Sequence, residues 1–100
     1  MIHTVNKSPF ERNSLDSCLR LSIKGSPILL LEDGVLAATK GTSISKKVAA
    51  AQSDHQIFVL GPDLQARGLA VGDVANGITV VDYGGFVDLV VEHGTVQSWL

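Results

Sequence analysis

Cys18 is the residue of this 100-residue chain best suited to covalent chemistry, because it is the only cysteine. The thiolate form of cysteine is the nucleophile that accepts sulfur, so thiol or persulfide chemistry is the reaction class to consider. Cys18 also lies three residues after Leu15, at the margin of an apolar helical stripe, where cysteine commonly serves as a small buried hydrophobe. Composition alone favours that second interpretation. A functional thiol would need exposure, and Arg12 or Arg20 could then lower its pKa.

Carboxylates at the ends of predicted strands form a second group of candidates. Glu32 and Asp33 directly follow an apolar run at residues 28–31, at the strand end where open parallel sheets usually bind ligands. Adjacent strand residues point to opposite faces, so we expect these two to serve in turns and caps rather than as a paired acid and base. Asp82 is expected to cap the last helix, and Tyr83 to provide either a rim hydroxyl or plain packing.

Other catalytic or cofactor motifs are not found. His3, His55 and His93 are scattered and lack a second histidine or cysteine at metal-ligand spacing, so we expect no metal site. We interpret His3 as a strand residue with a satisfied ring rather than a catalytic base. The chain contains no nucleophile elbow, Walker loop or dinucleotide-binding glycine pattern, and we therefore expect no cofactor.

The elements that must position these residues alternate between strands and helices. Strands are predicted at residues 1–5, 28–31, 56–60 and 78–81, and helices at about 14–24, 35–38, 44–51, 64–67 and 83–93. Phe86, Val87, Val90 and Val91 are placed on the inner side of the last helix. Connections of this length permit crossovers between parallel strands. We predict a single α/β domain, residues 1–100, folded as a three-layer α/β/α sandwich around a small parallel sheet of about four strands.

Composition indicates an oligomeric subunit. Hydrophobic residues make up 45% of the chain and charged residues 18%, which is apolar for so small a domain. Trp99 near the carboxyl end should be packed either against its own domain or into a partner. We single out Tyr83, Phe86, Trp99 and Leu100 as interface candidates.

Charge and cysteine content restrict the partners and the compartment. The net charge is -2 and no basic run exceeds two residues, so we expect no direct contact with nucleic acid. No apolar stretch is long enough to cross a bilayer, and a single cysteine cannot form an internal disulfide. We therefore expect a cytoplasmic protein without a membrane partner.

Several motifs, in order along nearly the whole chain, resemble the DsrH/TusB family. They lie at residues 2–10, 30–34 with 37–38, 59–68, 81–87 and 95–99. The resemblance implies a DsrE/F/H-like fold and a subunit of a cytoplasmic heterohexamer, with DsrE/TusD-like and DsrF/TusC-like sister chains, that transfers persulfide sulfur to a DsrC-like or TusE-like carrier. It also implies that the main active cysteine belongs to the DsrE/TusD-type sister, because Gly61-Pro62 occupies the equivalent turn here.

Two branches of that family are open for this chain. DsrH chains of sulfur oxidisers resemble it in having a cysteine in the first helix, so Cys18 favours a DsrEFH-like role in sulfur oxidation, with Cys18 as candidate persulfide acceptor. The alternatives are a TusB-like subunit of the relay for 2-thiouridine formation in tRNA, or a non-catalytic scaffold subunit.

Overall fold

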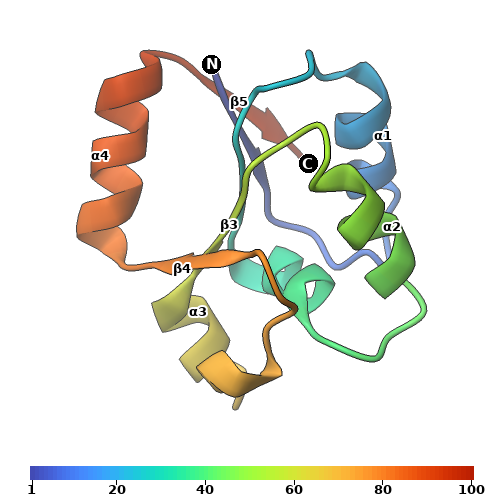
Figure 1. Cartoon of the computed structure of the whole chain (residues 1–100). Helices are drawn as coiled ribbons and strands as arrows, with labels where there is room; N and C mark the ends of the chain where they lie inside the picture. The colour runs from blue at the N-terminus through green and yellow to red at the C-terminus, as the bar shows by residue number, and fades with distance from the viewer.

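A five-stranded, fully parallel sheet forms the centre of the computed structural model, which describes residues 1–100 (Figure 1). The strand order is β4-β3-β2-β1-β5. The strands are β1 (Ile2–Val5), β2 (Ile28–Leu30), β3 (Ile57–Leu60), β4 (Thr79–Val81) and β5 (Val96–Trp99). The parallel α/β prediction is therefore confirmed, and the sheet has one strand more than expected.

Helical elements cover the two faces of the sheet unequally. They are α1 (Ser14–Leu21), the 3-10 helix η1 (Glu32–Ala38), α2 (Ser45–Ala51), α3 (Gly61–Ala66), the short 3-10 helix η2 (Val71–Asp73) and α4 (Tyr83–His93). Buried residues of α1, η1, α2 and α3 belong to one apolar cluster, whereas α4 contributes Leu89 to a separate cluster. Figure 1 shows α4 on one side of the sheet and α1 and α2 on the other. The three predicted layers are present.

Strand β2 lies in the middle of the sheet and is buried on both faces. Leu29 packs in the cluster under α4, and its neighbour Leu30 packs in the cluster on the opposite face. Both side chains are almost completely inaccessible to solvent. An uninterrupted apolar run is what such a strand requires, because alternate side chains face two different apolar layers.

Gly34 allows η1 to lie directly against the end of β1. A Cβ atom at this position would be 2.1 Å from the backbone carbonyl oxygen of Val5. No other residue type fits without moving one of the two backbones. This contact fixes where the chain turns after β2, and so where Glu32 and Asp33 lie.

The carboxyl tail is not an appended segment but strand β5, which pairs with β1 at one edge of the sheet. Trp99 packs against the core, and its indole Nε1 donates a hydrogen bond to His3 Nδ1 at 3.1 Å. The prediction that His3 is a strand residue with a satisfied ring is confirmed. The sheet has five strands rather than about four, because β5 pairs with a strand more than 90 residues away in the sequence, which local patterns do not reveal.

The predicted inner side of α4 was wrong at two positions. Leu89 is the buried residue of this helix, Phe86 and Val90 are partly buried, and Val87 and Val91 are exposed. The reason lies at Gly85, where a Cβ would be 3.0 Å from Val81 Cβ, so the helix approaches the sheet along its Gly85–Leu89 side. No helix of the structure has the length and apolar character needed to span a membrane.

Candidate functional site

Cys18 lies in the middle of α1 with its side chain inside the larger apolar cluster. Its exposed fraction is 0%, and its neighbours in that cluster include Leu15 and Val48. Burial raises the pKa of the thiol to about 11, and a hydrogen bond with the Ser22 side chain acts in the opposite direction. Arg12 and Arg20 are not among the causes. At neutral pH the side chain is therefore a thiol rather than a thiolate.

A chain of polar contacts connects this thiol to a histidine. Ser22 Oγ lies 3.3 Å from His55 Nε2, and His55 Nδ1 lies 2.8 Å from the backbone oxygen of Ser26. A carbonyl oxygen only accepts hydrogen bonds, so Nδ1 carries the proton and Nε2 accepts from Ser22. The order Cys18, Ser22, His55 is consequently the order in which a proton could pass from sulfur to imidazole.

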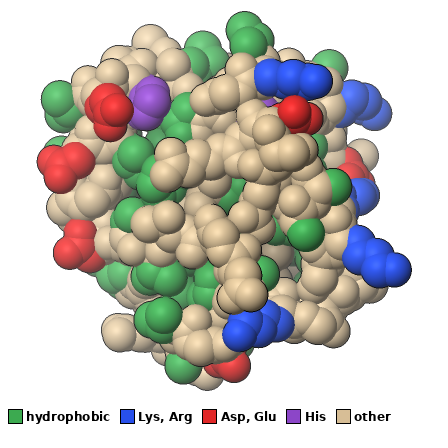
Figure 2. Space-filling model, viewed as in Figure 1, with side chains coloured by type: hydrophobic (Ala, Val, Ile, Leu, Met, Phe, Trp, Pro, Cys, Tyr) green, Lys and Arg blue, Asp and Glu red, His purple; other side chains and the backbone are tan.

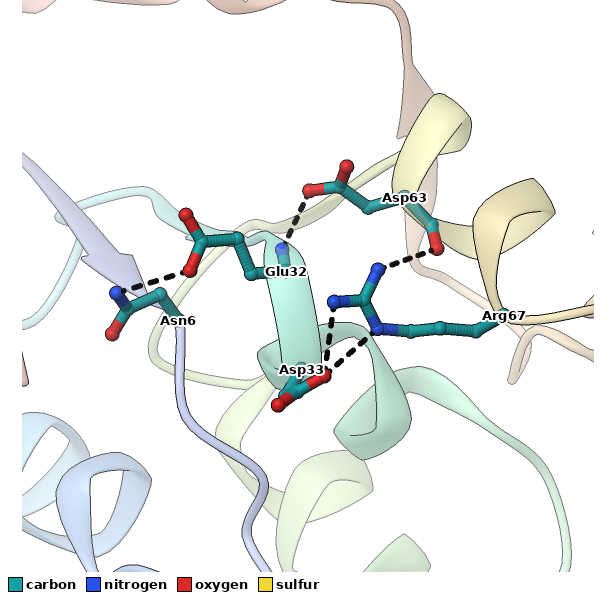
Figure 3. A network of polar contacts seen from close by, with 5 residues as sticks. All are labelled: Asn6, Glu32, Asp33, Asp63 and Arg67. Carbon is teal, nitrogen blue, oxygen red and sulfur yellow. Dashed lines mark hydrogen bonds and ion pairs between the residues drawn. The ribbon is translucent and has the colours of Figure 1, made fainter.

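The second candidate region is the rim formed by the carboxyl ends of β1, β2 and β3 (Figure 3). Glu32 is the first residue of η1 and has a φ of 50°, in the left-handed region. Its backbone N–H donates to Asp63 Oδ2 at 2.5 Å, and its carboxylate accepts a 3.4 Å hydrogen bond from Asn6 Nδ2. The side-chain oxygen of Asn6, Oδ1, is buried without a hydrogen-bond partner. The rim thus joins three segments that are distant in the sequence.

Arg67 closes the other side of the rim. Its guanidinium contacts Asp33 Oδ1 through Nη2 at 2.9 Å and through Nε at 3.0 Å, and Nη1 donates to the backbone oxygen of Asp63. Figure 3 shows Glu32 and Asp33 turned in different directions, toward Asn6 and Arg67 respectively. As predicted, the two adjacent carboxylates do not form a paired acid and base. They hold the β2–η1 turn against β1 and α3.

The remaining sequence-predicted residues lie apart from this rim network. Asp82 caps α4 as predicted, because its Oδ1 accepts a hydrogen bond from the backbone N–H of Gly85 at 2.8 Å. Tyr83 and Leu100 are exposed, whereas Phe86 and Trp99 are partly buried against the two apolar clusters. No three metal-ligating side chains come together anywhere in the chain.

Sequence reasoning did not identify Asn6, Asp63, Arg67, Ser22 or His55 as members of these networks. The first three meet because β1, β2 and β3 are neighbours in a parallel sheet, so their carboxyl ends share one edge. A correct prediction of the strand order would have indicated that these three residues lie at the same edge of the sheet. Ser22 and His55 are 33 residues apart, and only the packing of α1 beside the start of β3 brings them together.

Comparisons with known proteins identify relatives along nearly the whole chain. The family model described as "DsrH like protein" matches residues 7–96. Protein TusB of Pectobacterium parmentieri is 38% identical over 99 residues, covering 99% of this chain and 100% of the relative. Protein TusB of Escherichia coli (strain K12) is 37% identical with the same coverage.

Two solved structures share the fold at low sequence identity. MTH1491 of Methanobacterium thermoautotrophicum, described as a protein of unknown function, has a TM-score of 0.73 at 15% identity and covers 97% of this chain and 96% of its own. Protein Tm0979 of Thermotoga maritima has a TM-score of 0.63 at 18% identity, covering 95% and 97%. At these identities the similarity shows the fold alone.

Proposed function

This chain belongs to the DsrH/TusB family, and on that premise we propose that it is a subunit of a sulfur relay complex that does not itself carry sulfur. The full-length matches at 37% and 38% identity support membership of the family. The observation that carries the non-catalytic assignment is the complete burial of Cys18, together with the raised pKa of its thiol. A persulfide acceptor must meet a sulfur donor as an accessible thiolate, and this side chain meets neither condition.

Within the family, the relatives favour the TusB branch. Sequence analysis preferred sulfur oxidation because of Cys18, but the similar curated chains are named TusB. We therefore propose the tRNA 2-thiouridine relay as the pathway of this subunit, in place of sulfur oxidation. The cysteine that motivated the earlier preference is explained by packing in α1.

The proposed assembly contains sister subunits of the DsrE/TusD and DsrF/TusC types, two copies of each of the three chains, in the cytoplasm. The sulfur would be held by the active cysteine of the DsrE/TusD-type sister and passed to a TusE-like carrier. This chain would shape the complex and the surface on which the carrier docks. Its exposed apolar residues, including Tyr83 and Leu100, suit a chain that is covered by partners.

Intact-mass analysis of the assembled complex, after treatment with a persulfide donor, tests this assignment. We expect a reducible gain of one sulfur on the sister subunit and no gain on this chain. A Cys18→Ala complex should load and transfer sulfur at the rate of the unmodified complex. A gain of one sulfur on this chain that the variant cannot make would contradict the non-catalytic role.

The contact of Cys18 with Ser22, and that of Ser22 with His55, favour a second candidate function, in which Cys18 does accept sulfur. Its thiol proton would pass through Ser22 to His55, and the resulting thiolate would attack the outer sulfur of a sister subunit's persulfide. The sister's S–S bond would break, the sister would leave as a thiolate that takes the proton, and Cys18 would become the persulfide. This route needs α1 to open.

The reactivity of Cys18 toward iodoacetamide distinguishes the two candidates. The relay predicts alkylation of the native complex within minutes, slowed about tenfold or more by His55→Gln, because the base that removes the proton is then lost. The non-catalytic role predicts slow alkylation at a rate set by opening of the fold, with full reaction only in denaturant. His93→Gln is the matched control.

A further inference from the structure

Helix α4 presents an apolar row to solvent on the side away from the core. Tyr83, Val87 and Val91 lie at intervals of four residues, and their exposed fractions are 60%, 59% and 77%. Residues at this spacing lie on one side of a helix, so the three side chains form a continuous strip, here called the α4 stripe. Leaving three large apolar side chains exposed together is unusual for an isolated surface helix.

Carboxylates accompany the α4 stripe, and no Lys or Arg side chain balances them. Asp82, Asp88 and Glu92 are all exposed. Residues 68–100 contain four carboxylates and neither Lys nor Arg, so residues 1–67 carry a net charge of +2 in a chain whose total is -2. Figure 2 shows apolar side chains gathered between α4 and the strands, acidic ones on the outer side of α4, and Lys and Arg toward the opposite side of the molecule.

The face of the sheet beneath α4 is also the more thinly covered of the two faces. The cluster between α4 and the sheet has four buried residues, among them Ile2 and Leu89. Val96 pairs with Ile2 in register, so it points to the same face of the sheet, yet its side chain remains exposed. The apolar surface on this face therefore extends beyond the helix to the edge strand β5.

We propose that the α4 stripe is the surface on which a sister subunit docks, and that this partner presents an apolar centre with Lys or Arg at its rim. The proposal rests on the proposed function. Charge complementarity selects the kind of partner, because like charges facing each other across an interface oppose association. A symmetric contact between two copies through α4 would place Asp88 and Glu92 of one copy near the same carboxylates of the other. A different chain with basic residues avoids that repulsion.

The test is the affinity of this chain for the co-purified pair of sister subunits from the same organism. In the double variant Val87→Lys/Val91→Lys we expect the dissociation constant to rise about 30-fold or more, as for loss of central interface residues. Both positions are exposed and lysine is a good helix former, so the isolated variant should keep its far-ultraviolet circular dichroism spectrum. The matched control is Leu21→Lys/Ile23→Lys, which alters two exposed apolar residues at the end of α1 and should bind normally.

A second measurement addresses the basic rim of the partner. Asp88→Asn/Glu92→Gln should lower the association rate about tenfold in low salt, and the difference from the unmodified chain should disappear in high salt. Charge changes of this kind do not depend on core packing, so the measurement is informative even where a stripe variant loses structure. An unchanged rate in low salt would overturn the proposed basic rim.

The binding measurements distinguish failure of the α4 docking surface from failure of the proposed function. If the unmodified chain does not bind the sister pair, the proposed function fails. If it binds and the stripe variant binds equally well, the function stands and the α4 docking surface is overturned. If the chain alone self-associates and the stripe variant abolishes this, the occupant is a second copy and the proposed partner is wrong.

Discussion

The two faces of the sheet differ in how completely they are covered. The face toward α1, η1, α2 and α3 has a cluster of 14 buried residues, whereas the face under α4 has a cluster of four. Burial of apolar area is the main favourable term in folding, so most of the stability of the isolated chain resides in the first face. The second face instead leaves apolar and acidic side chains of α4 exposed. We therefore expect the first face to provide most of the stability, and the proposed partner to bind at the second face.

The difference between the two faces also bears on the position of Cys18. The thiol belongs to the thickly covered face, within the 14-residue cluster that also contains residues of η1, α2 and α3. A residue that must meet a donor or carrier protein would be better placed on a thinly covered face or on a rim. The location of the cysteine therefore agrees with a packing role, and it makes the proposed docking surface and the only thiol structurally separate.

The largest effect is expected for Gly34→Ala, which tests how tightly η1 is held against the end of β1 on the thickly covered face. The new Cβ would lie 2.1 Å from the Val5 carbonyl oxygen, so either η1 or β1 must move. We expect the free energy of unfolding, measured in urea, to fall by about 4 kcal/mol or more. Gly72→Ala is the control, because its Cβ would meet no atom within 4 Å, and it should change stability by less than about 0.5 kcal/mol. A mild effect of Gly34→Ala would mean that η1 is free to shift.

Leu29 and Leu30 test whether the two faces of the sheet contribute differently to stability, because these neighbours in β2 point to opposite faces. Leu30→Ala should leave a cavity among many fixed elements and cost about 4 kcal/mol. Leu29→Ala should cost about 3 kcal/mol, because a single helix, α4, can partly close the space. Urea unfolding of both variants measures the difference. A greater loss for Leu29→Ala would reverse the assignment of stability to the two faces.

The third prediction concerns the edge strand and its dependence on pH. Burial, with smaller contributions from the charges of His55 and the amino terminus, lowers the pKa of His3 below 6.5. The unfolded chain then binds a proton more readily than the folded chain. The stability that depends on neutral His3 is complete above about pH 6.5 and is lost as the pH falls below this value.

Trp99, the only tryptophan, reports this loss directly by its fluorescence. Its Nε1–H donates to His3 Nδ1, which must be unprotonated to accept. Unfolding followed by Trp99 emission should require less urea at pH 5 than at pH 7.5. In His3→Asn, which keeps an acceptor but no titrating group, this difference should shrink. An equal pH dependence in the two chains would remove His3 as the cause.

Sequence alone predicted those features that depend on local pattern. The apolar run in β2, the bounds of α4 at Tyr83–His93 and the Asp82 cap all follow from neighbouring residues. Strand β5 was not predicted because most of its residues are exposed and it is defined by pairing with β1. The outward position of Val87 and Val91 was missed because the close contact of Gly85 with β4, not apolar spacing, sets the rotation of α4.

The candidate sites were predictable only in part, for a related reason. Cys18, Glu32 and Asp33 were identified from residue type and position. Asn6, Asp63 and Arg67 join them only because of the order of the parallel strands. Whether Cys18 is buried depends on tertiary packing around α1, because members of its cluster such as Val48 of α2 and Leu64 of α3 are distant from it in the sequence.

The smallest effect is expected for substitutions of Glu32, which separate backbone strain from side-chain function at the rim formed by the carboxyl ends of β1, β2 and β3. Glu32 adopts a φ of 50°, which disfavours a residue with a Cβ by about 1 kcal/mol, whereas glycine tolerates it. Glu32→Gly keeps the N–H that donates to Asp63 and loses a long, exposed contact with Asn6. After the entropic disadvantage of glycine in the unfolded chain, we expect a net gain of about 0.5 kcal/mol in urea unfolding.

Glu32→Gln, which retains the backbone strain, should show no such gain. A loss of stability in Glu32→Gly would mean that the carboxylate contributes more to the rim than its 3.4 Å contact indicates. A gain accompanied by weaker binding of the sister pair would instead make the rim part of an interface. In that case partner binding would not be confined to the α4 face, and the division of roles between the two faces of the sheet would no longer hold.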